Sequence, residues 1–173
     1  MAAPDLADPN FYRSVVLVVQ HDSEGAFGLV MNRPTRKTVR EVWNQLGRGE
    51  CSCDSPLFLG GPVTGPLIAL HDDGSRAEAQ VLPGVYVSAS KEVIDSLIER
   101  PPGKMRVFTC YSGWGPNQLE LELDEGAWIV VPATAELVFS DEDLWVKLSH
   151  DLGQRFLRSI LRPERIPDDP SLN

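Results

Sequence analysis

The chain has 173 residues, of which 42% are hydrophobic and 24% charged, and its formal net charge is -9 at pH 7. This composition is that of one globular domain with a hydrophobic core, and it excludes a disordered chain. The acidic charge repels the phosphate backbone, so direct nucleic-acid binding is disfavoured. No apolar run approaches the roughly 20 residues of a membrane span, so we expect a cytoplasmic protein without a membrane part.

The first third of the chain predicts a β-hairpin, a helix and a further strand. Residues 14–20 and 26–31 are apolar runs around a polar, Gly-containing turn, and their unbroken hydrophobicity predicts strands buried on both faces. Residues 38–46 carry apolar side chains at helical spacing. Residues 48–56 predict a surface loop, and residues 57–59 predict a short strand.

The remaining chain alternates short strands with two helices. A helix begins after Ser90, and a longer one runs to residue 161 from a capping box formed by Ser140 and Asp143. Residues 119–123 alternate leucine with acidic residues and fit either a strand or the start of a helix. The further predicted strands, of which 127–131 has the strongest signal for burial, are residues 67–71, 77–82, 85–87, 105–111, 127–131 and 137–139.

Short hairpin-type turns join most of these elements. This organisation favours an α+β fold with a mixed sheet, in a single domain, over a doubly wound fold. The domain covers residues 1–161. Residues 162–173 are rich in Pro and Asp and predict an extended or disordered C-terminal tail.

The segment from residue 108 to residue 122 is the most distinctive part of the chain. An apolar run leads into Gly113-Trp114-Gly115-Pro116, where the glycines allow unusual backbone angles and the proline suits the first turn of a helix. The structural interpretation is a tight turn whose tryptophan packs into the core, which is the commoner role of such residues. The functional interpretation is a ligand or partner site at a strand end, lined by Tyr111, Trp114, Gln118 and Glu120.

Motifs of common catalytic sites do not fit. Gly60 and Gly65 have the spacing of a phosphate-binding loop, but Pro66 and Leu67 stand where Lys and Ser or Thr are required. Ser112 lacks the flanking glycines of a serine hydrolase elbow. We therefore find no catalytic residues and predict no cofactor.

The cysteines and histidines do not predict a metal site. Structural zinc needs four ligands, and no second pair of Cys or His follows Cys51 and Cys53 at suitable spacing. Three cysteines also argue against a disulfide framework. Cys110 follows an apolar strand and is either a small buried residue or a reactive thiol. The histidines are predicted to be turn or surface residues: His21, His71 and His150.

Several of these motifs together resemble the AlgH/YqgE family of bacterial proteins. The shared blocks, which span nearly the whole chain, are residues 8–11, 24–34, 60–63, 111–120 and 126–128. The resemblance implies one α+β domain with a bent, bifurcated mixed sheet and packed helices, and a role as a transcriptional regulator.

Two departures from the family pattern are visible. Members usually begin with a further strand of the type Gly-x-Leu-Leu-Ile-Ala, which is absent ahead of Pro4, so we expect an open sheet edge or a misplaced start. Cys110 also stands where glycine is common in the family.

We expect the family blocks to converge on one binding cleft. The preferred function is a cytoplasmic regulatory protein that acts through a protein or small-molecule partner; its oligomeric state is not predicted. One alternative is an enzyme or redox sensor that uses Cys110 as a reactive thiol near Trp114, and another is a purely structural interaction module. The predicted cleft residues are Asn32, Arg33, Gly60, Gly61, Pro62, Tyr111, Ser112, Gly113, Trp114, Gly115, Gln118 and Glu120.

Overall fold

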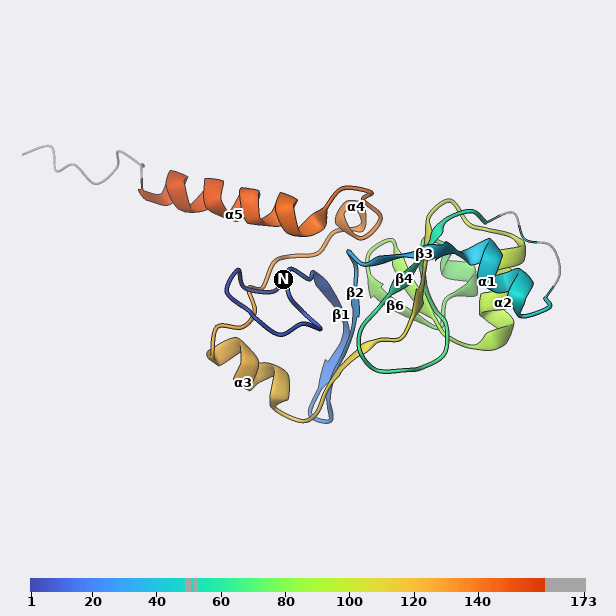
Figure 1. Ribbon diagram of the computed structural model, residues 1–173, viewed down its shortest axis with the longest axis horizontal. Helices are drawn as coiled ribbons and strands as arrows, with labels where there is room; N and C mark the ends of the chain where they lie inside the picture. Colours follow the sequence, from blue (N-terminus) through green and yellow to red (C-terminus); the bar gives the residue numbers. More distant parts are fainter. Residues whose placement is uncertain (49–50, 52, 161–173) are drawn as a thin grey trace, which may run out of the picture.

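The computed structural model describes residues 1–48, 51 and 53–160, so the predicted tail at 162–173 lies outside the described residues. The strands are β1 (Val16–Asp22), β2 (Gly25–Val30), β3 (Pro34–Thr38), β4 (Pro56–Leu59), β5 (Ile68–His71), β6 (Ala79–Leu82), β7 (Val85–Ser88), β8 (Met105–Thr109) and β9 (Ser112–Trp114). The helices are α1 (Val39–Gln45), the 3-10 turn η1 (Gly74–Arg76), α2 (Lys91–Glu99), α3 (Gln118–Asp124), α4 (Ala135–Val138) and α5 (Leu144–Ile160) (Figure 1).

The strands of the described chain form two sheets. One has the order β1-β2-β9, and the other has the order β3-β4-β8-β5-β7-β6. The second sheet is mixed because β4 pairs with β8 in parallel and its other pairs are antiparallel. The chain passes between the sheets directly after β2, and the predicted α+β fold is confirmed.

Apolar packing joins the layers in three clusters. The largest lies between the two sheets and the α4–α5 region, around Leu29 and Phe108. The second covers the other face of the six-stranded sheet, where Trp43 of α1 and Leu97 of α2 pack together. The third holds Trp114 and Trp128 against the N-terminal segment. Each cluster buries residues from distant parts of the chain, which fixes how the elements sit.

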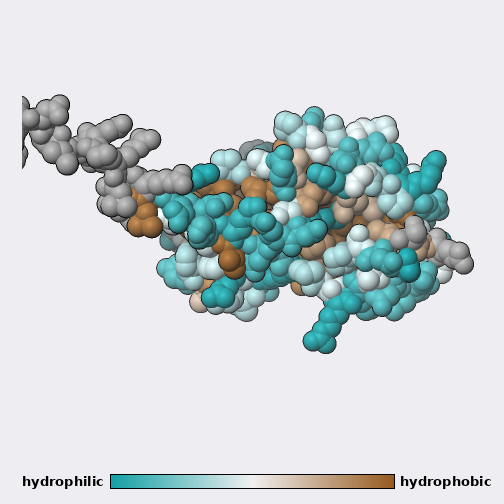
Figure 2. Space-filling view, turned by 90° about the horizontal axis from the view of Figure 1, so that it is seen from above, coloured by the Kyte–Doolittle hydropathy of each residue, from teal (hydrophilic) through white to brown (hydrophobic). Residues whose placement is uncertain are grey.

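Helix α5 projects from the body of the domain (Figure 1). It begins at Asp143, whose side chain accepts hydrogen bonds from the backbone amides of Trp145 and Val146, as expected of a helix N-cap. The predicted cap at Ser140 is therefore wrong, because Ser140 lies earlier in the loop between α4 and α5, where its Oγ accepts from the Glu142 amide. Figure 2 shows the molecule from above: apolar surface, in brown, lies among hydrophilic residues, in teal.

Two predicted strands are not strands in the structure. The only bridge that residues 127–131 form within the described chain is the one between Ala2 and Trp128. Val130 is 77% exposed, because no described strand lies beside the second half of this run. Residues 137–139 were expected in a strand, but Leu137 belongs to α4, whose first turn is capped by Thr134.

Burial also differs from expectation at β1 and at the two close cysteines. Strand β1 is an edge strand and is exposed along much of its length, so it is not buried on both faces. Cys51 and Cys53 are buried in the cluster beneath α2, so the predicted surface loop at 48–56 turns part of its side chains inward.

The burial of His71 also differs from expectation: the residue is fully buried, whereas a turn or surface residue was predicted. Its Nε2 lies 3.1 Å from Ser88 Oγ. Since Ser88 Oγ donates to the carbonyl oxygen of Arg76, it accepts a hydrogen bond from His71 Nε2. Burial lowers the pKa of His71 below the ordinary value, because the imidazolium loses its hydration.

This lowered pKa predicts that His71 makes the fold weaker in mild acid. The unfolded chain binds the proton more readily than the folded one, so stability is complete above about pH 6.5 and falls as the pH drops toward the folded-state pKa. We expect urea midpoints to fall from pH 7 to pH 5, and to fall less steeply in His71→Gln. An equal slope in both proteins would contradict this, and the exposed His150→Gln is the control.

Candidate functional site

The Gly60-Gly61 block packs directly against residues 110–112. Ser112 Oγ donates to the carbonyl oxygen of Gly60 at 3.0 Å. Val63 and Tyr111 exchange two backbone hydrogen bonds of 2.9 Å each. Of the other members of these blocks, Pro62 is exposed and Gly113 pairs with Phe27 of β2. The Val30 amide also donates to the carbonyl oxygen of Gly60, so the structure brings the blocks at 24–34, 60–63 and 111–120 together through their backbones.

Asn32 and Arg33 hold the N-terminal segment in place. The Asn32 side chain accepts from the Val15 amide and donates to the Arg13 carbonyl oxygen, both at 2.9 Å. Arg33 donates from Nη1 to the carbonyl oxygen of Asn10. Burial of its guanidinium lowers the pKa of Arg33 from the ordinary value. The side chains of Asn32 and Arg33 are therefore engaged in hydrogen bonds within the fold.

Trp114 lies in a cluster of aromatic rings. Its ring stacks on Phe11, with centroids 5.8 Å apart, and meets the edge of Trp128 at 5.9 Å. Both indole nitrogens donate to the same oxygen, Glu122 Oε2, at 2.9 Å from Trp114 and 2.7 Å from Trp128. The tryptophan is buried as packing, and Glu122 satisfies the polar atom that packing would otherwise leave unpaired.

The tail of the motif is tied together by local hydrogen bonds. Gln118 accepts from the Gly115 amide at 3.0 Å and donates to Glu122 Oε1 at 2.9 Å. Glu120 pairs on the surface with His21 at 2.6 Å. The pKa of the Glu120 carboxyl group is lowered mainly by a hydrogen bond from its own backbone amide, and further by the hydrogen bond with His21. Residues 119–123, left undecided by the sequence, are helical.

Cys110 has a left-handed backbone with a φ of 62°, and its sulfur lies 3.8 Å from Thr109 Oγ1. Glycine adopts such a backbone without strain, which gives a physical reason for the glycine common at this place in the family. The side chain is half-buried, between the two extremes that the sequence left open.

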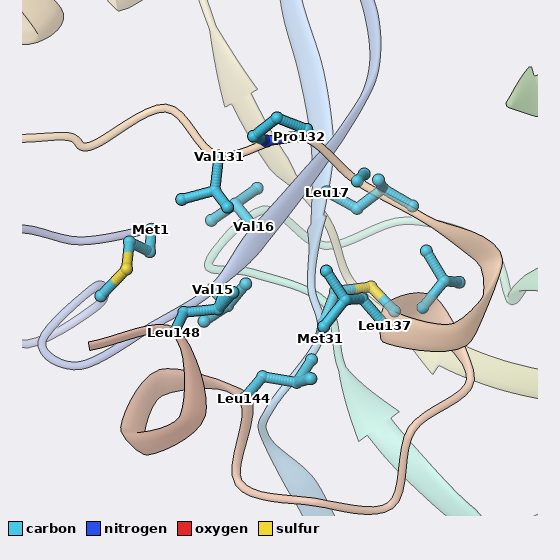
Figure 3. A pocket seen from close by; sticks show the side chains of 12 residues that line it. Met1, Val15, Val16, Leu17, Met31, Val131, Pro132, Leu137, Leu144 and Leu148 are labelled. Atoms are coloured by element: carbon cyan, nitrogen blue, oxygen red, sulfur yellow. The ribbon is translucent and has the colours of Figure 1, made fainter. Parts of the chain in front are cut away.

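An apolar groove lies on the other side of Trp114, along the free edge of β1. It consists of three adjoining cavities of about 250, 60 and 180 Å³ that share Val131. Trp114 and Trp128 wall one end. Leu148 of α5 lies toward the other end, beside Val131 and Met1 (Figure 3). We call this feature the β1 groove; its central residues are Met1, Val16, Val18, Ile129, Val130 and Val131.

The N-terminal residues show how a chain segment fits at this edge. The Ala2 amide donates to the carbonyl oxygen of Ser14, just before β1. On the opposite side, the N-terminal ammonium group of Met1 donates to the carbonyl oxygen of Ile129, and the Ala3 amide donates to that of Ala127. Successive backbone nitrogens thus donate to opposite sides, which is typical of a strand that lies between two neighbours. The β1 groove continues this line beyond Met1, with Val18, 41% exposed, on one side and Val130 on the other.

Sequence reasoning located Trp114 but missed the rest of this groove. The available signal is the apolar run at 127–131, which predicts a buried strand. Apolar residues in such a run indicate burial by some partner, and the sequence does not say whether that partner is present.

Among the described residues, no helix is long and apolar enough to cross a membrane.

Comparison with known proteins places the chain in a family. A family model described as AlgH-like matches residues 1–157. A UPF0301 protein of Myxococcus xanthus is 40% identical over 159 residues, which cover 88% of each chain. Another from Streptomyces coelicolor is 38% identical over 194 aligned positions, which cover 100% of this chain and 92% of the relative. The chain belongs to the AlgH-like family.

Solved structures agree with this assignment. The solution structure of AlgH from Pseudomonas aeruginosa is 32% identical, with a TM-score of 0.74, over 94% of this chain and 90% of that one. A crystal structure of a Corynebacterium diphtheriae protein shares the fold at 22% identity and a TM-score of 0.71, over 87% of this chain and 83% of that one.

Proposed function

We propose that this AlgH-like protein has a regulatory role that it exerts by binding a protein partner, and that the β1 groove receives an extended apolar segment of that partner. The observation that carries the proposal is the apolar groove between residues 129–131 and β1, which is an edge strand among the described residues. An exposed strand edge offers unpaired backbone groups to an incoming strand, and pockets beside it select the side chains.

The groove suits a strand better than a compact ligand. Its first two cavities are lined mainly by apolar side chains, and one flank is strand β1. An added strand would hydrogen bond to β1 on one side and to residues 130–131 on the other, because Ile129 already bonds to Met1. Val130, now largely exposed, would then be covered, which removes an apolar side chain from water. The acidic net charge of the chain fits a protein partner better than nucleic acid.

The test uses a fluorescein-labelled hexapeptide, Gly-Ser-Leu-Leu-Ile-Ala, titrated with the protein and followed by fluorescence anisotropy. We expect saturable binding that weakens at least about tenfold in Val18→Lys and in Val130→Lys, because each lysine places a charge in the apolar groove. Leu46→Lys is the matched control: it also replaces an exposed apolar residue, but at the end of α1, and leaves the affinity unchanged.

A second peptide separates strand pairing from simple apolar adhesion. Gly-Ser-Leu-Pro-Ile-Ala keeps an apolar side chain at the substituted position but lacks one amide donor and cannot complete the strand ladder. We expect it to bind at least about tenfold more weakly. Equal binding of both peptides, or unchanged binding in both groove variants, would contradict the proposal.

A further inference from the structure

A second cavity, which we call the Arg106 cavity, lies where β4 and β8 begin. Its volume is about 310 Å³, and it shares no lining residue with the β1 groove. Small-molecule sites of proteins begin at about this size, near 300 Å³. Its walls include Ser55, Phe58, Lys104, Arg106, Phe139 and Asp141.

Arg106 carries a buried positive charge on the wall of this cavity. The residue is 7% exposed and lies in the middle of the six-stranded sheet. Its guanidinium donates to the carbonyl oxygen of Met31 at 3.0 Å and to that of Ser140. Both partners are neutral. They satisfy two of its five N–H donors, but they do not balance its charge.

The nearest counter-charge only partly compensates for this burial. Asp141 Oδ1 lies 3.8 Å from Arg106 Nη2, beyond hydrogen-bond distance, and the Asp141 side chain is fully exposed. Water screens an ion pair of that kind, so its stabilising effect is small. Burial lowers the pKa of Arg106 from its ordinary value although Asp141 acts in the opposite direction.

Lys104 adds a second positive charge beside two aromatic rings. Its Nζ lies 5.9 Å from the centroid of Phe139, and Arg106 Cζ lies 4.8 Å from the centroid of Phe58. Within the lining the two cations outnumber the single carboxylate of Asp141 by one, and Glu136, outside the lining, also acts on Lys104. The cavity thus combines an excess positive charge with apolar, aromatic walls.

We infer that the Arg106 cavity binds a small organic monocarboxylate, whose carboxylate pairs with Arg106 and Lys104 and whose apolar body lies against Phe58 and Phe139. A single negative charge matches the one excess positive charge. The planar guanidinium also matches the geometry of a carboxylate, which accepts two parallel hydrogen bonds. Inorganic phosphate, which carries more charge at neutral pH and has no apolar body, fits these walls less well.

Isothermal titration with sodium benzoate at constant ionic strength tests the inference. We expect saturable binding of one benzoate per chain at millimolar concentration. Benzyl alcohol, which has the same ring without the charge, and inorganic phosphate, which has charge without the ring, are each expected to bind at least about tenfold more weakly. Absence of saturable benzoate binding up to about 10 mM, or equal binding of either comparator, overturns the inference.

Variants locate the site. Lys104 is exposed, and Lys104→Gln is expected to weaken benzoate binding about fivefold through loss of one partly screened charge. Asp141→Asn is expected to tighten binding, because it removes the negative charge at the cavity; damage to the fold would not produce that gain. Lys91→Gln on α2 is the matched control for loss of a surface lysine. Unchanged affinity in both Lys104→Gln and Asp141→Asn overturns the assignment.

Arg106→Gln is expected to abolish benzoate binding in a folded protein, as judged by circular dichroism. Because Arg106 also bonds to Met31 and Ser140, its loss affects the fold as well. If Arg106→Gln does not fold, the Lys104 and Asp141 variants decide the inference. Peptide binding in the β1 groove is measured on the same variants, and its outcome is independent because the two sites share no residue.

Discussion

Gly61→Ala is expected to lower the free energy of unfolding by about 3 kcal/mol, the upper end of the cost of overpacking a closely packed site. An added Cβ would lie 2.3 Å from the carbonyl carbon and oxygen of Tyr111. Those are backbone atoms, held by the two hydrogen bonds between Val63 and Tyr111, so they cannot move aside as a flexible side chain would. Urea denaturation followed by circular dichroism measures the loss.

Gly153→Ala provides the control with the opposite sign. Gly153 lies within α5, and an added Cβ there meets no atom within 4 Å. Because alanine favours the helix over glycine, we expect this variant to be more stable by about 0.5 to 1 kcal/mol. If Gly61→Ala retains the stability of the unmodified protein, the close approach of the Gly60-Gly61 block to Tyr111 is not what requires glycine there.

The sequence predicted best the elements that depend on local pattern alone. The hairpin of β1 and β2 is confirmed, with Val16 opposite Val30. The helix α1 begins at the Thr38 cap and buries Val39 and Trp43, as the apolar spacing indicates. In these segments the turn, the cap and the periodicity all favour the same structure, so neighbouring residues contain enough information.

Elements that need a distant partner could not be predicted in the same way. The run at 127–131 has the composition of a buried strand, but a strand forms only where another segment supplies a ladder of hydrogen bonds. In the described chain the N-terminal residues pair with its first half alone. The apolar residues near Leu137 likewise fit a strand until Thr134 caps a helix turn. Apolar character predicts burial, whereas the type of element depends on its neighbours.

The candidate sites likewise combine residues that the local sequence points to with contacts that only the fold creates. The sequence marked Trp114 and the glycine blocks, but their roles depend on contacts between segments far apart in the chain. In the sequence, Arg106 interrupts an apolar strand. A charged residue at such a position indicates either the edge of a sheet or a buried polar site. That its neighbours include Phe58 and Asp141 follows only from the three-dimensional fold.

Glu122→Ala is expected to destabilise the protein by about 3 kcal/mol, because it leaves two indole N–H groups without their shared acceptor. Trp114 and Trp128 are both buried and both donate to Glu122 Oε2, so one carboxylate oxygen satisfies two polar groups of the aromatic cluster. Glu122→Gln retains a carbonyl oxygen but loses the negative charge, so we expect a loss of about 1 kcal/mol. Urea denaturation monitored by tryptophan fluorescence measures both variants.

Glu120→Ala separates this effect from the general loss of an acidic residue in α3. Glu120 lies on the same helix, but its carboxylate pairs on the surface with His21, so its urea midpoint should not change measurably. Equal midpoints for Glu122→Ala and Glu120→Ala would show that the shared acceptor is dispensable. Because Trp114 and Trp128 also wall the β1 groove, Glu122→Ala is expected to weaken binding of the apolar hexapeptide, whereas Glu120→Ala leaves it unchanged.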